Sequence, residues 1–317
     1  MAETISFRTL GSTGERVSCI GLGGSHVGDS KLSDREAKNI IRTAIESGIT
    51  FLDNSWDYHK GRSEELVGSV LKENPAYRER AFVMTKIDGR TEKEAEKQIN
   101  QSLKRLGVDY LDLLQHHEVI RFDDVDRIFE EDGATAAFDK AKEDGKIRYT
   151  GFTGHKDPHI HLYMLEQADR HDVHFDAVQM PLNVMDCHFR SFEKLVLPEL
   201  LRRKIGVLGM KSMAYGVILK SNTVTAEECL RYTLSLPISV LITGIDSEKI
   251  LDQAIRIATD FTPLSPEEME ALRAKTRHAG AHGEFELFKT SSRFDATAEN
   301  PEWLGELSER VEALAGN

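Results

Sequence analysis

Side chains that can handle protons follow several short apolar segments of this chain. Asp53 comes directly after one such segment, and Tyr58 lies five residues further on. Taken alone, these two residues suit a loop cap and a half-buried aromatic, since acids and aromatic side chains are common near loops. Lys86 and His117, however, occupy the corresponding place after two later segments. An acid, a phenol, an amine and an imidazole at one edge of a sheet form a proton-transferring set.

Short apolar runs recur about every 30 residues, each followed by a helical or loop segment. They are Val17 to Leu22, Ile49 to Leu52, Ala81 to Thr85, Tyr110 to Leu114, Ile147 to Phe152, Ala177 to Met180, Gly206 to Met210 and Ser239 to Thr243. Eight strand–helix units predict an α/β fold of the (β/α)8 TIM barrel type, with functional side chains at the carboxyl ends of the strands. An open doubly wound sheet would use fewer strands and a glycine-rich phosphate loop after the first.

Capping signals predict where the helices begin and end. Ser33 with Glu36 and Thr91 with Glu94 are typical helix starts, whereas Gly48 and Gly107 are typical stops. Pro158 predicts the first turn of another helix. We expect a small hairpin at the N-terminus, with Thr4 to Phe7 and Val17 to Leu22 around the turn Gly11 to Gly14. Extra helices are expected over Ser265 to His278 and Trp303 to Leu314, with mostly loop over Gly280 to Asn300. No linker is visible, so we expect one domain over residues 1–317.

Charge and composition exclude several function classes. Lys and Arg number 41 and Asp and Glu 53, a net charge of −12. This balance argues against a nucleic-acid or membrane partner, because both are bound through clustered basic side chains. Cys19, Cys187 and Cys229 are far apart and suit small buried residues in a reducing cytosol. We find no secretory signal and no membrane-spanning segment, so we expect a soluble cytoplasmic protein.

Several motifs, in order along nearly the whole chain, resemble the aldo-keto reductase family. They are Arg8-Thr9-Leu10-Gly11, Val17 to Gly24, Phe51-Leu52-Asp53 with Tyr58, Gly61-Arg62-Ser63-Glu64 with Gly68, Thr85-Lys86, Tyr110 to Leu114 leading to His117, Gly151-Phe152-Thr153, and Gln179. The resemblance implies a barrel enzyme that reduces aldehydes or ketones with a nicotinamide cofactor.

The resemblance also implies catalytic roles. Tyr58 would be the general acid that protonates the substrate oxygen, while the Lys86 ammonium would favour the phenolate and Asp53 would balance Lys86. His117 would orient the carbonyl or relay the proton. It matches the family's histidine because it lies five residues after Asp112; His116 is then a strand residue facing the outer helices, or a departure of unknown purpose.

The cofactor positions match the family less closely. Thr153 and Gln179 are implied to hold the nicotinamide carboxamide, but Gly154 replaces the usual Asn, and His155 could supply the missing group. Met210 stands where the family often has a Tyr that stacks on the nicotinamide. The glycine-rich stretch after the first strand lacks the spacing and the following helix start of a dinucleotide fingerprint. The expected cofactor-binding residues are Gly23, Gly24, Asp53, Thr153, Gly154, Gln179, Met210, Lys211, Ser212, Gly244, Asp246, Ser247, Lys249 and Gln253.

The choice of nucleotide stays open. NADP(H) is the family default, but Asp246 would repel a 2′-phosphate, and Lys249 is the nearest base to bind one. NAD(H) is therefore the alternative cofactor.

Two other functions also stay open. One is a regulatory protein that keeps the reductase barrel, as potassium channel β subunits do. The other is a metal-dependent barrel enzyme, suggested by His155, His159, His161, His171 and His174, although we expect these to follow a surface helix and its turn, away from a set of carboxylate ligands.

The substrate is expected to be a small carbonyl or alcohol. The segments Glu118 to Gly133 and Met213 to Thr225 are expected to rim the pocket and set substrate choice. His59 and Lys60 suit either a solvated loop or a substrate contact. The sequence does not define the substrate or the oligomeric state.

Overall fold

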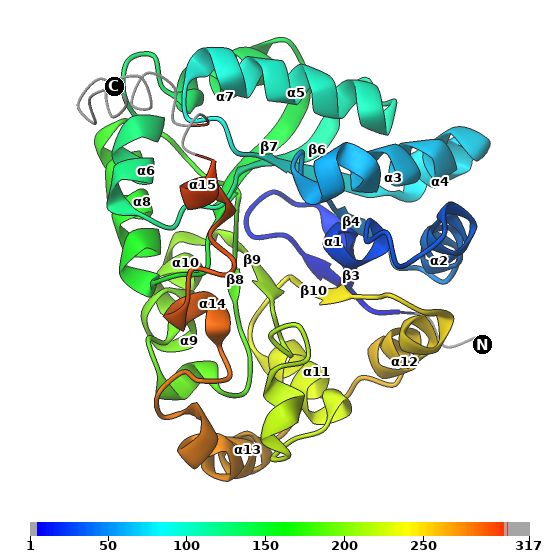
Figure 1. The fold of residues 1–317 in the computed structure, drawn as a ribbon, viewed down its shortest axis with the longest axis vertical. Helices are drawn as coiled ribbons and strands as arrows, with labels where there is room; N and C mark the ends of the chain where they lie inside the picture. Colours follow the sequence, from blue (N-terminus) through cyan, green and yellow to red (C-terminus); the bar gives the residue numbers. More distant parts are fainter. Residues whose placement is uncertain (1–4, 301–302, 304–317) are drawn as a thin grey trace, which may run out of the picture.

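Eight parallel strands close into a barrel, and helices surround it (Figure 1). The structure, a computed structural model, describes residues 5–300 and Trp303. Each strand pairs with the next along the chain, and β10 closes the barrel against β3. The strands are β3 Ile20–Gly23, β4 Phe51–Asp53, β5 Phe82–Ile87, β6 Leu111–His116, β7 Ile147–Thr153, β8 Ala177–Pro181, β9 Gly206–Met210 and β10 Val240–Gly244. The predicted (β/α)8 barrel is confirmed.

The principal helices begin and end close to the predicted signals. Ser33 and Glu36 form a complete capping box at the start of α2, and Gly107 ends α5 with φ +64°. The helices are α1 Gly24–Val27, α2 Asp34–Glu46, α3 Arg62–Glu73, α4 Pro75–Arg80, α5 Glu92–Leu106, α6 Phe122–Ile128, α7 Ala134–Glu143, α8 Pro158–Arg170, α9 Phe192–Leu195, α10 Leu197–Arg203, α11 Ala226–Ser235, α12 Glu248–Thr259, α13 Pro266–Gly280, α14 Leu287–Thr290 and α15 Ala296–Glu299. Short 3-10 turns are η1 Tyr58–Gly61, η2 Asp186–His188 and η3 Ile218–Ser221.

An antiparallel hairpin of β1 (Phe7–Thr9) and β2 (Arg16–Ser18) seals the bottom of the barrel. Leu10 and Val17 of this hairpin join the apolar cluster inside the barrel, which includes Phe51, Met84 and Leu208. The prediction of one strand from Val17 to Leu22 is wrong, because the chain leaves β2 at Cys19 and enters the barrel as β3. Thr4, expected in the hairpin, lies outside the described residues.

The chain enters a short helix directly after β3, which corrects the prediction that no helix starts there. That helix, α1, begins at Gly24. A glycine is required at this point because a Cβ on Gly24 would lie 2.6 Å from the carbonyl oxygen of Asp53.

The C-terminal segment returns to the open, carboxyl end of the barrel strands. The segment from 280 to 300 was expected to be mostly loop; it also contains α14 and α15 (Figure 1). It is anchored by Lys289, whose buried Nζ lies 2.7 Å from Asp186 Oδ1 and 2.9 Å from Glu286 Oε1. The helix expected over Trp303 to Leu314 lies outside the described residues, apart from Trp303.

Candidate active site

The ends of β4 and β5 hold a buried ion pair. Lys86 Nζ donates to Asp53 Oδ1 at 2.5 Å and to the carbonyl oxygen of Asn54 at 2.7 Å. Both charged side chains are almost completely buried. Burial lowers the pKa of Lys86, and the neighbouring Asp53 carboxylate opposes that shift. The lysine is thus held in place by two acceptors, one of them charged.

The Tyr58 hydroxyl lies against this ion pair. Lys86 Nζ donates to it at 3.2 Å, and the phenol ring stands edge-on to His117 with centroids 5.7 Å apart. Burial raises the pKa of Tyr58 well above its ordinary value, and the Asp53 carboxylate adds to the rise. Lys86 is placed to favour the phenolate, but the net shift of the Tyr58 pKa is upward because burial disfavours the charged form, so the phenol keeps its proton.

A turn with unusual backbone angles positions Tyr58. The two residues after it, His59 and Lys60, have φ of +53° and +59°. His59 Nε2 lies 2.7 Å from the carbonyl oxygen of Ser25, and neither residue lines a cavity at the strand ends. These contacts favour the loop interpretation of His59 and Lys60 over a substrate contact.

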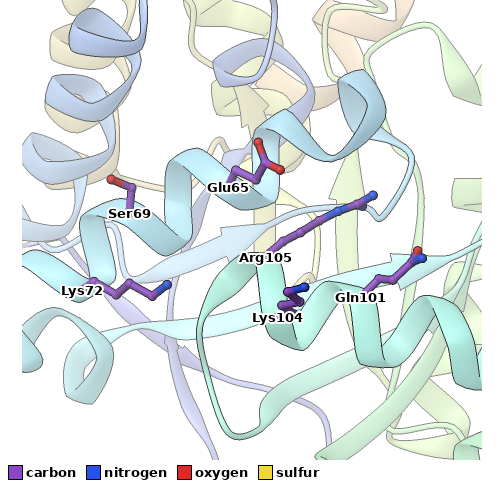
Figure 2. A pocket seen from close by; sticks show the side chains of 6 residues that line it. All are labelled: Glu65, Ser69, Lys72, Gln101, Lys104 and Arg105. Atoms are coloured by element: carbon purple, nitrogen blue, oxygen red, sulfur yellow. The ribbon is translucent and has the colours of Figure 1, made fainter.

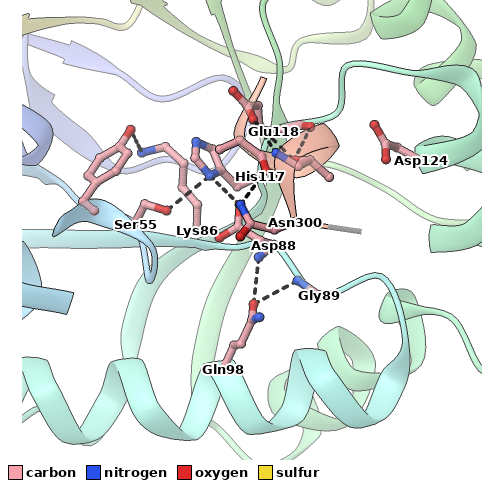
Figure 3. Close-up of polar contacts among 12 residues, drawn as sticks. Ser55, Lys86, Asp88, Gly89, Gln98, His117, Glu118, Asp124 and Asn300 are labelled. Carbon is pink, nitrogen blue, oxygen red and sulfur yellow. Dashed lines mark hydrogen bonds and ion pairs between the residues drawn. The ribbon is translucent and has the colours of Figure 1, made fainter. Parts of the chain in front are cut away.

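His117 completes the group of four predicted catalytic side chains. Its Nδ1 lies 2.8 Å from Asp88 Oδ1 and 3.3 Å from Ser55 Oγ (Figure 3). Burial, followed by the nearby Lys86 ammonium, holds the pKa of His117 well below its usual range, so the imidazole is neutral. The sequence reasoning missed Asp88 and Ser55. Asp88 sits two residues after Lys86 at the same strand end, which was the available signal.

His116 points away from the site. Its ring stacks on Phe138 of α7, with centroids 3.9 Å apart. Of the two interpretations offered, the strand residue facing the outer helices is therefore confirmed.

A cavity of about 200 Å³ opens beside the Tyr58 hydroxyl. Its walls come from the carboxyl ends of five strands, β4, β5, β6, β7 and β9, and from the C-terminal segment. The lining residues are Asp57, Tyr58, Lys86, His117, Glu118, Thr153, Gly154, His155, Met210, Lys211, Tyr215, Arg293, Phe294, Ala296 and Glu299. We call this space the substrate cavity. Of the predicted rim from Glu118 to Gly133, Glu118 alone is among its lining residues; the segment continues into α6.

The C-terminal segment binds the wall of the substrate cavity at Glu118. The Thr297 backbone N–H donates to Glu118 Oε2 at 3.1 Å, and its hydroxyl donates to the Glu118 carbonyl oxygen at 3.2 Å. Burial raises the pKa of Glu118 to about 8. His155 Nε2 lies 3.7 Å from Glu118 Oε1, and burial lowers the pKa of His155 to about 3. Near pH 7, this part of the cavity wall therefore holds a protonated, neutral Glu118 and a neutral His155.

A second cavity, of about 290 Å³, runs from Tyr58 toward the start of α12. We call it the cofactor cavity. The predicted residues that line it are Gly23, Asp53, Gln179, Met210, Lys211, Ser212, Gly244, Asp246 and Gln253. Met213, Tyr215, Gly216 and Leu219 also line it, so the rim predicted over Met213 to Thr225 borders this cavity. The two cavities share Tyr58, Met210, Lys211 and Tyr215.

Five predicted cofactor residues do not line this second cavity. Thr153 and Gly154 face the substrate cavity. Gly24 packs against Asp53, Ser247 caps α12 by accepting from the Ile250 N–H, and Lys249 is exposed. His155, like Thr153, lines the substrate cavity and not the second one, and its role in place of the missing amide stays a prediction.

Gly154 stands in place of the family's asparagine for a packing reason. A Cβ at this position would lie 2.1 Å from the carbonyl oxygen of Val119. The Val119 N–H also donates to the Thr153 carbonyl oxygen at 2.9 Å. The loops after β6 and β7 are thus too close together for any side chain.

Two buried polar atoms without a hydrogen-bond partner, close to where the two cavities meet, could bind a primary carboxamide. Gln179 Oε1 and Thr153 Oγ1 are buried and have no hydrogen-bond partner among the described residues. One is an acceptor and the other can donate, which matches the NH2 and C=O groups of nicotinamide. The residues present therefore fit a nicotinamide cofactor.

A groove of about 660 Å³ lies on the outside of the barrel between α3 and α5 (Figure 2). It is lined by Glu65, Ser69, Lys72, Gln101, Lys104 and Arg105. None of the four predicted catalytic residues reaches it, so we do not assign it to the active site.

The histidine-rich segment around α8 does not form a metal site in the described part of the chain, where no three His, Cys, Asp or Glu side chains are placed to hold an ion. His159 is exposed and pairs with Asp157, whereas His161 is buried against Phe152 and Phe192. The expectation that the whole cluster lies on a surface helix is therefore wrong for His155 and His161.

Two further expectations concern burial and membranes. Cys19, Cys187 and Cys229 are free thiols buried in the protein, as predicted. Within residues 5–300, no helix has both the length and the apolar character needed to cross a bilayer.

Comparisons with known proteins agree with this geometry. Residues 19–228 match the sequence profile of the Aldo/keto reductase family. The chain is 31% identical over 225 residues to L-galactose dehydrogenase of Arabidopsis thaliana, covering 68% of this chain and 67% of that protein. It is 31% identical over 122 residues to a probable voltage-gated potassium channel subunit beta of the same plant, covering 36% of this chain and 37% of that protein. The fold is similar to that of aldo-keto reductase AKR11C1 from Bacillus halodurans, with a TM-score of 0.71 and 21% identity over 86% of this chain and 96% of that one.

Proposed function

Since this chain belongs to the aldo/keto reductase family and is thereby an oxidoreductase, we propose that it reduces aldehydes or ketones to alcohols with NAD(P)H. The observation that carries the proposal is the hydrogen-bonded series Asp53, Lys86, Tyr58, whose phenol stands where the two cavities meet. A substrate carbonyl in one cavity and a nicotinamide in the other would then lie on either side of one proton donor.

Tyr58 is the general acid in this proposal. Its raised pKa keeps the phenol protonated near neutral pH, which is the form needed to donate to a developing alkoxide. Lys86 donates to the phenol oxygen and stabilises it once the proton has left, and Asp53 keeps Lys86 oriented. His117 lines the substrate cavity and orients the substrate oxygen.

The bound nicotinamide supplies the hydride. Gln179 and Thr153 would hold its carboxamide through their unpartnered atoms. Met210 would lie against the ring with its polarisable thioether, and Ser212, Gly244 and Gln253 would border the rest of the dinucleotide.

We propose NAD(H) as the preferred nucleotide. The end of the cofactor cavity near α12 is lined by Asp246 and Gln253, and Lys211 is the one Lys or Arg among the described residues that line it. Lys249 is exposed and outside the lining. A carboxylate beside the ribose accepts from a 2′-hydroxyl but repels a 2′-phosphate.

The direct test measures carbonyl reduction and coenzyme binding in the same preparations. A panel of small aldehydes, ketones and aldoses is assayed with NADH and with NADPH; aldoses are included because the plant relative is named for a sugar. We expect Tyr58→Phe to lose roughly 100-fold or more in kcat while binding coenzyme normally. Unchanged reduction by Tyr58→Phe would exclude the catalytic role of Tyr58.

A regulatory barrel is the second candidate, favoured by the partial similarity to a potassium channel β subunit. In that case the protein would bind coenzyme, and no substrate of the panel would turn over appreciably. The intact Asp53–Lys86–Tyr58 series supports the enzyme instead. We further propose that residues 1–317 act as one barrel domain on small molecules in the cytoplasm.

A further inference from the structure

We propose that Asp88 is a positioning residue that determines which ring nitrogen of His117 carries the proton, and thereby whether His117 receives an alcohol or a carbonyl. The inference rests on the proposed function and deepens it. Asp88 does not face the substrate cavity; it acts through the imidazole.

Hydrogen bonds to the backbone on both sides fix the positions of Asp88 and His117 relative to each other. Asp88 follows β5 directly, and the backbone N–H groups of Asp88 and Gly89 both donate to Gln98 Oε1, at 2.8 and 2.9 Å (Figure 3). Arg90 Nη1 donates to the carbonyl oxygens of Asp88, at 2.9 Å, and His117, at 2.6 Å. The 2.8 Å contact between Asp88 Oδ1 and His117 Nδ1 is therefore set by the ends of two neighbouring strands.

The other ring nitrogen of His117 is available to a substrate. Nε2 makes no hydrogen bond among the described residues, and His117 lines the substrate cavity. Figure 3 shows this nitrogen on the side of the ring that faces Lys86. The side chain is 13% exposed, whereas that of Asp88 is completely buried.

A neutral imidazole carries one N–H proton, which can be on Nδ1 or on Nε2. When Asp88 is ionised it can only accept, so Nδ1–H must donate to it and Nε2 is left with a lone pair. That lone pair accepts from the hydroxyl of an alcohol. When Asp88 is protonated, its O–H can donate to Nδ1, and Nε2–H then donates to the oxygen of a carbonyl.

The protonation state of Asp88 changes near neutral pH. Burial raises the pKa of Asp88 to about 7, against the opposing effect of Arg90 and Lys86. The titratable and charged groups around the pair, from β4, β5 and the loops after β4, β5 and β6, are Asp53, Asp57, Tyr58, His59, Lys86, Arg90 and Glu118. Asp88 is neutral below about pH 7, which favours carbonyl binding, and ionised above it, which favours alcohol binding.

The first test determines directly which ring nitrogen of His117 carries the proton, and it does not require catalytic turnover. Protein labelled with 15N in its histidine rings is examined by NMR about one pH unit below and above 7, and the His117 signals are assigned by their loss in His117→Gln. We expect the protonated nitrogen to be Nε2 at the lower pH and Nδ1 at the higher pH. The switch should be absent in Asp88→Asn. The same tautomer at both pH values in the wild type, or the same switch in Asp88→Asn, would overturn the proposal.

The second test separates positioning from structural support. The pH profiles of kcat/KM are measured for alcohol oxidation and for carbonyl reduction in wild type, Asp88→Asn and Ser55→Ala. Asp88→Asn should lose the ionisation near pH 7 and about 10-fold or more in oxidation. Ser55→Ala, which removes the non-ionisable neighbour of Nδ1, should retain that ionisation. Equal losses in both directions by Asp88→Asn, with the ionisation retained, would mean that Asp88 serves only the fold. Absence of turnover in the wild type would instead contradict the proposed function and leave the NMR result standing.

Discussion

At the scale of single residues, the active site depends on charges that are buried in pairs. Lys86 is held by Asp53 in a space with almost no access to water. An unpaired carboxylate in such a place is costly, because its hydration is lost and nothing replaces the lost interaction. The pair is therefore expected to affect stability as well as the proposed catalysis.

Removing one partner should cost more than removing both. We expect Lys86→Met to lower the free energy of unfolding by about 3 kcal/mol, because Asp53 is left buried without its cation. The double variant Asp53→Asn with Lys86→Met should be more stable than Lys86→Met alone. Urea denaturation of the three proteins measures this difference, and a double variant that is less stable than Lys86→Met would contradict it.

Asp246 offers a single-residue test of nucleotide choice. Asp246→Arg should raise the ratio of NADPH to NADH affinity roughly 10-fold, since a repulsive carboxylate is replaced by a phosphate-binding cation. Calorimetric titration with both nucleotides measures it. Asp123→Arg on α6 makes the same charge change away from both cavities and should leave the ratio unaltered. A similar ratio change in both variants would indicate a net-charge effect.

The sequence was sufficient to predict that four side chains, Asp53, Tyr58, Lys86 and His117, lie together, but not which residues support them. Asp53, Lys86 and His117 could be found because each lies at or just beyond the carboxyl end of a strand, where a barrel gathers its functional groups. The contact of Asp88 with His117 joins two loops 29 residues apart in the sequence. No local spacing specifies such a contact; it depends on how two strand ends are aligned in three dimensions.

At the scale of elements, helix boundaries were predicted well because capping residues act locally. Ser33, Thr91 and Ser265 all accept the backbone N–H that their position predicts. Strand boundaries were less regular: β9 matches its predicted range, whereas β3, β5 and β6 are shifted by one to three residues at their ends. Their pairing is set by neighbours far away in the sequence, and apolar runs alone do not show where it ends.

The approach of the loops after β6 and β7 yields a prediction about Gly154. Gly154→Ala should destabilise the protein by about 1–3 kcal/mol and lower activity, because its Cβ would lie 2.1 Å from the Val119 carbonyl oxygen. Gly145→Ala serves as the control: it has φ +71° but open space around it, so about 1 kcal/mol of backbone strain is expected without loss of kcat. Thermal unfolding and the reduction assay together separate the two effects, and equal kcat in both variants would exclude a role of this close approach in the site.

At the scale of the whole molecule, several carboxyl groups are buried with raised pKa values. These values are about 7 for Asp88, about 8 for Glu118 and about 7 for Glu286. A carboxyl whose pKa is higher in the folded state binds its proton more tightly there, so it stabilises the fold at low pH and loses that contribution as pH rises through the folded value. Buried histidines with lowered pKa values, His155 and His161, act in the opposite sense, but below about pH 6.5.

Stability should therefore fall as the pH rises from about 6.5 to about 8.5. In this window the carboxyls still titrate and the histidines no longer do. Glu118 alone should account for about 1–2 kcal/mol, since the window covers the upper part of its shift. Denaturant unfolding at the two ends of the window measures the change. Glu118→Gln keeps an acceptor for the Thr297 N–H but cannot ionise, so its stability should vary less; an identical pH dependence would contradict the assignment.

The attachment of the C-terminal segment at Glu118 has a consequence for the order in which the two cavities are completed along the chain. Residues 293 to 299 supply one wall of the substrate cavity, whereas the cofactor cavity is bordered by residues no later than Gln253. During synthesis on the ribosome, the residues that border the cofactor cavity emerge before the C-terminal residues that line the substrate cavity. A chain stopped shortly before this segment would keep the residues that border the cofactor cavity but would lack one wall of the substrate cavity.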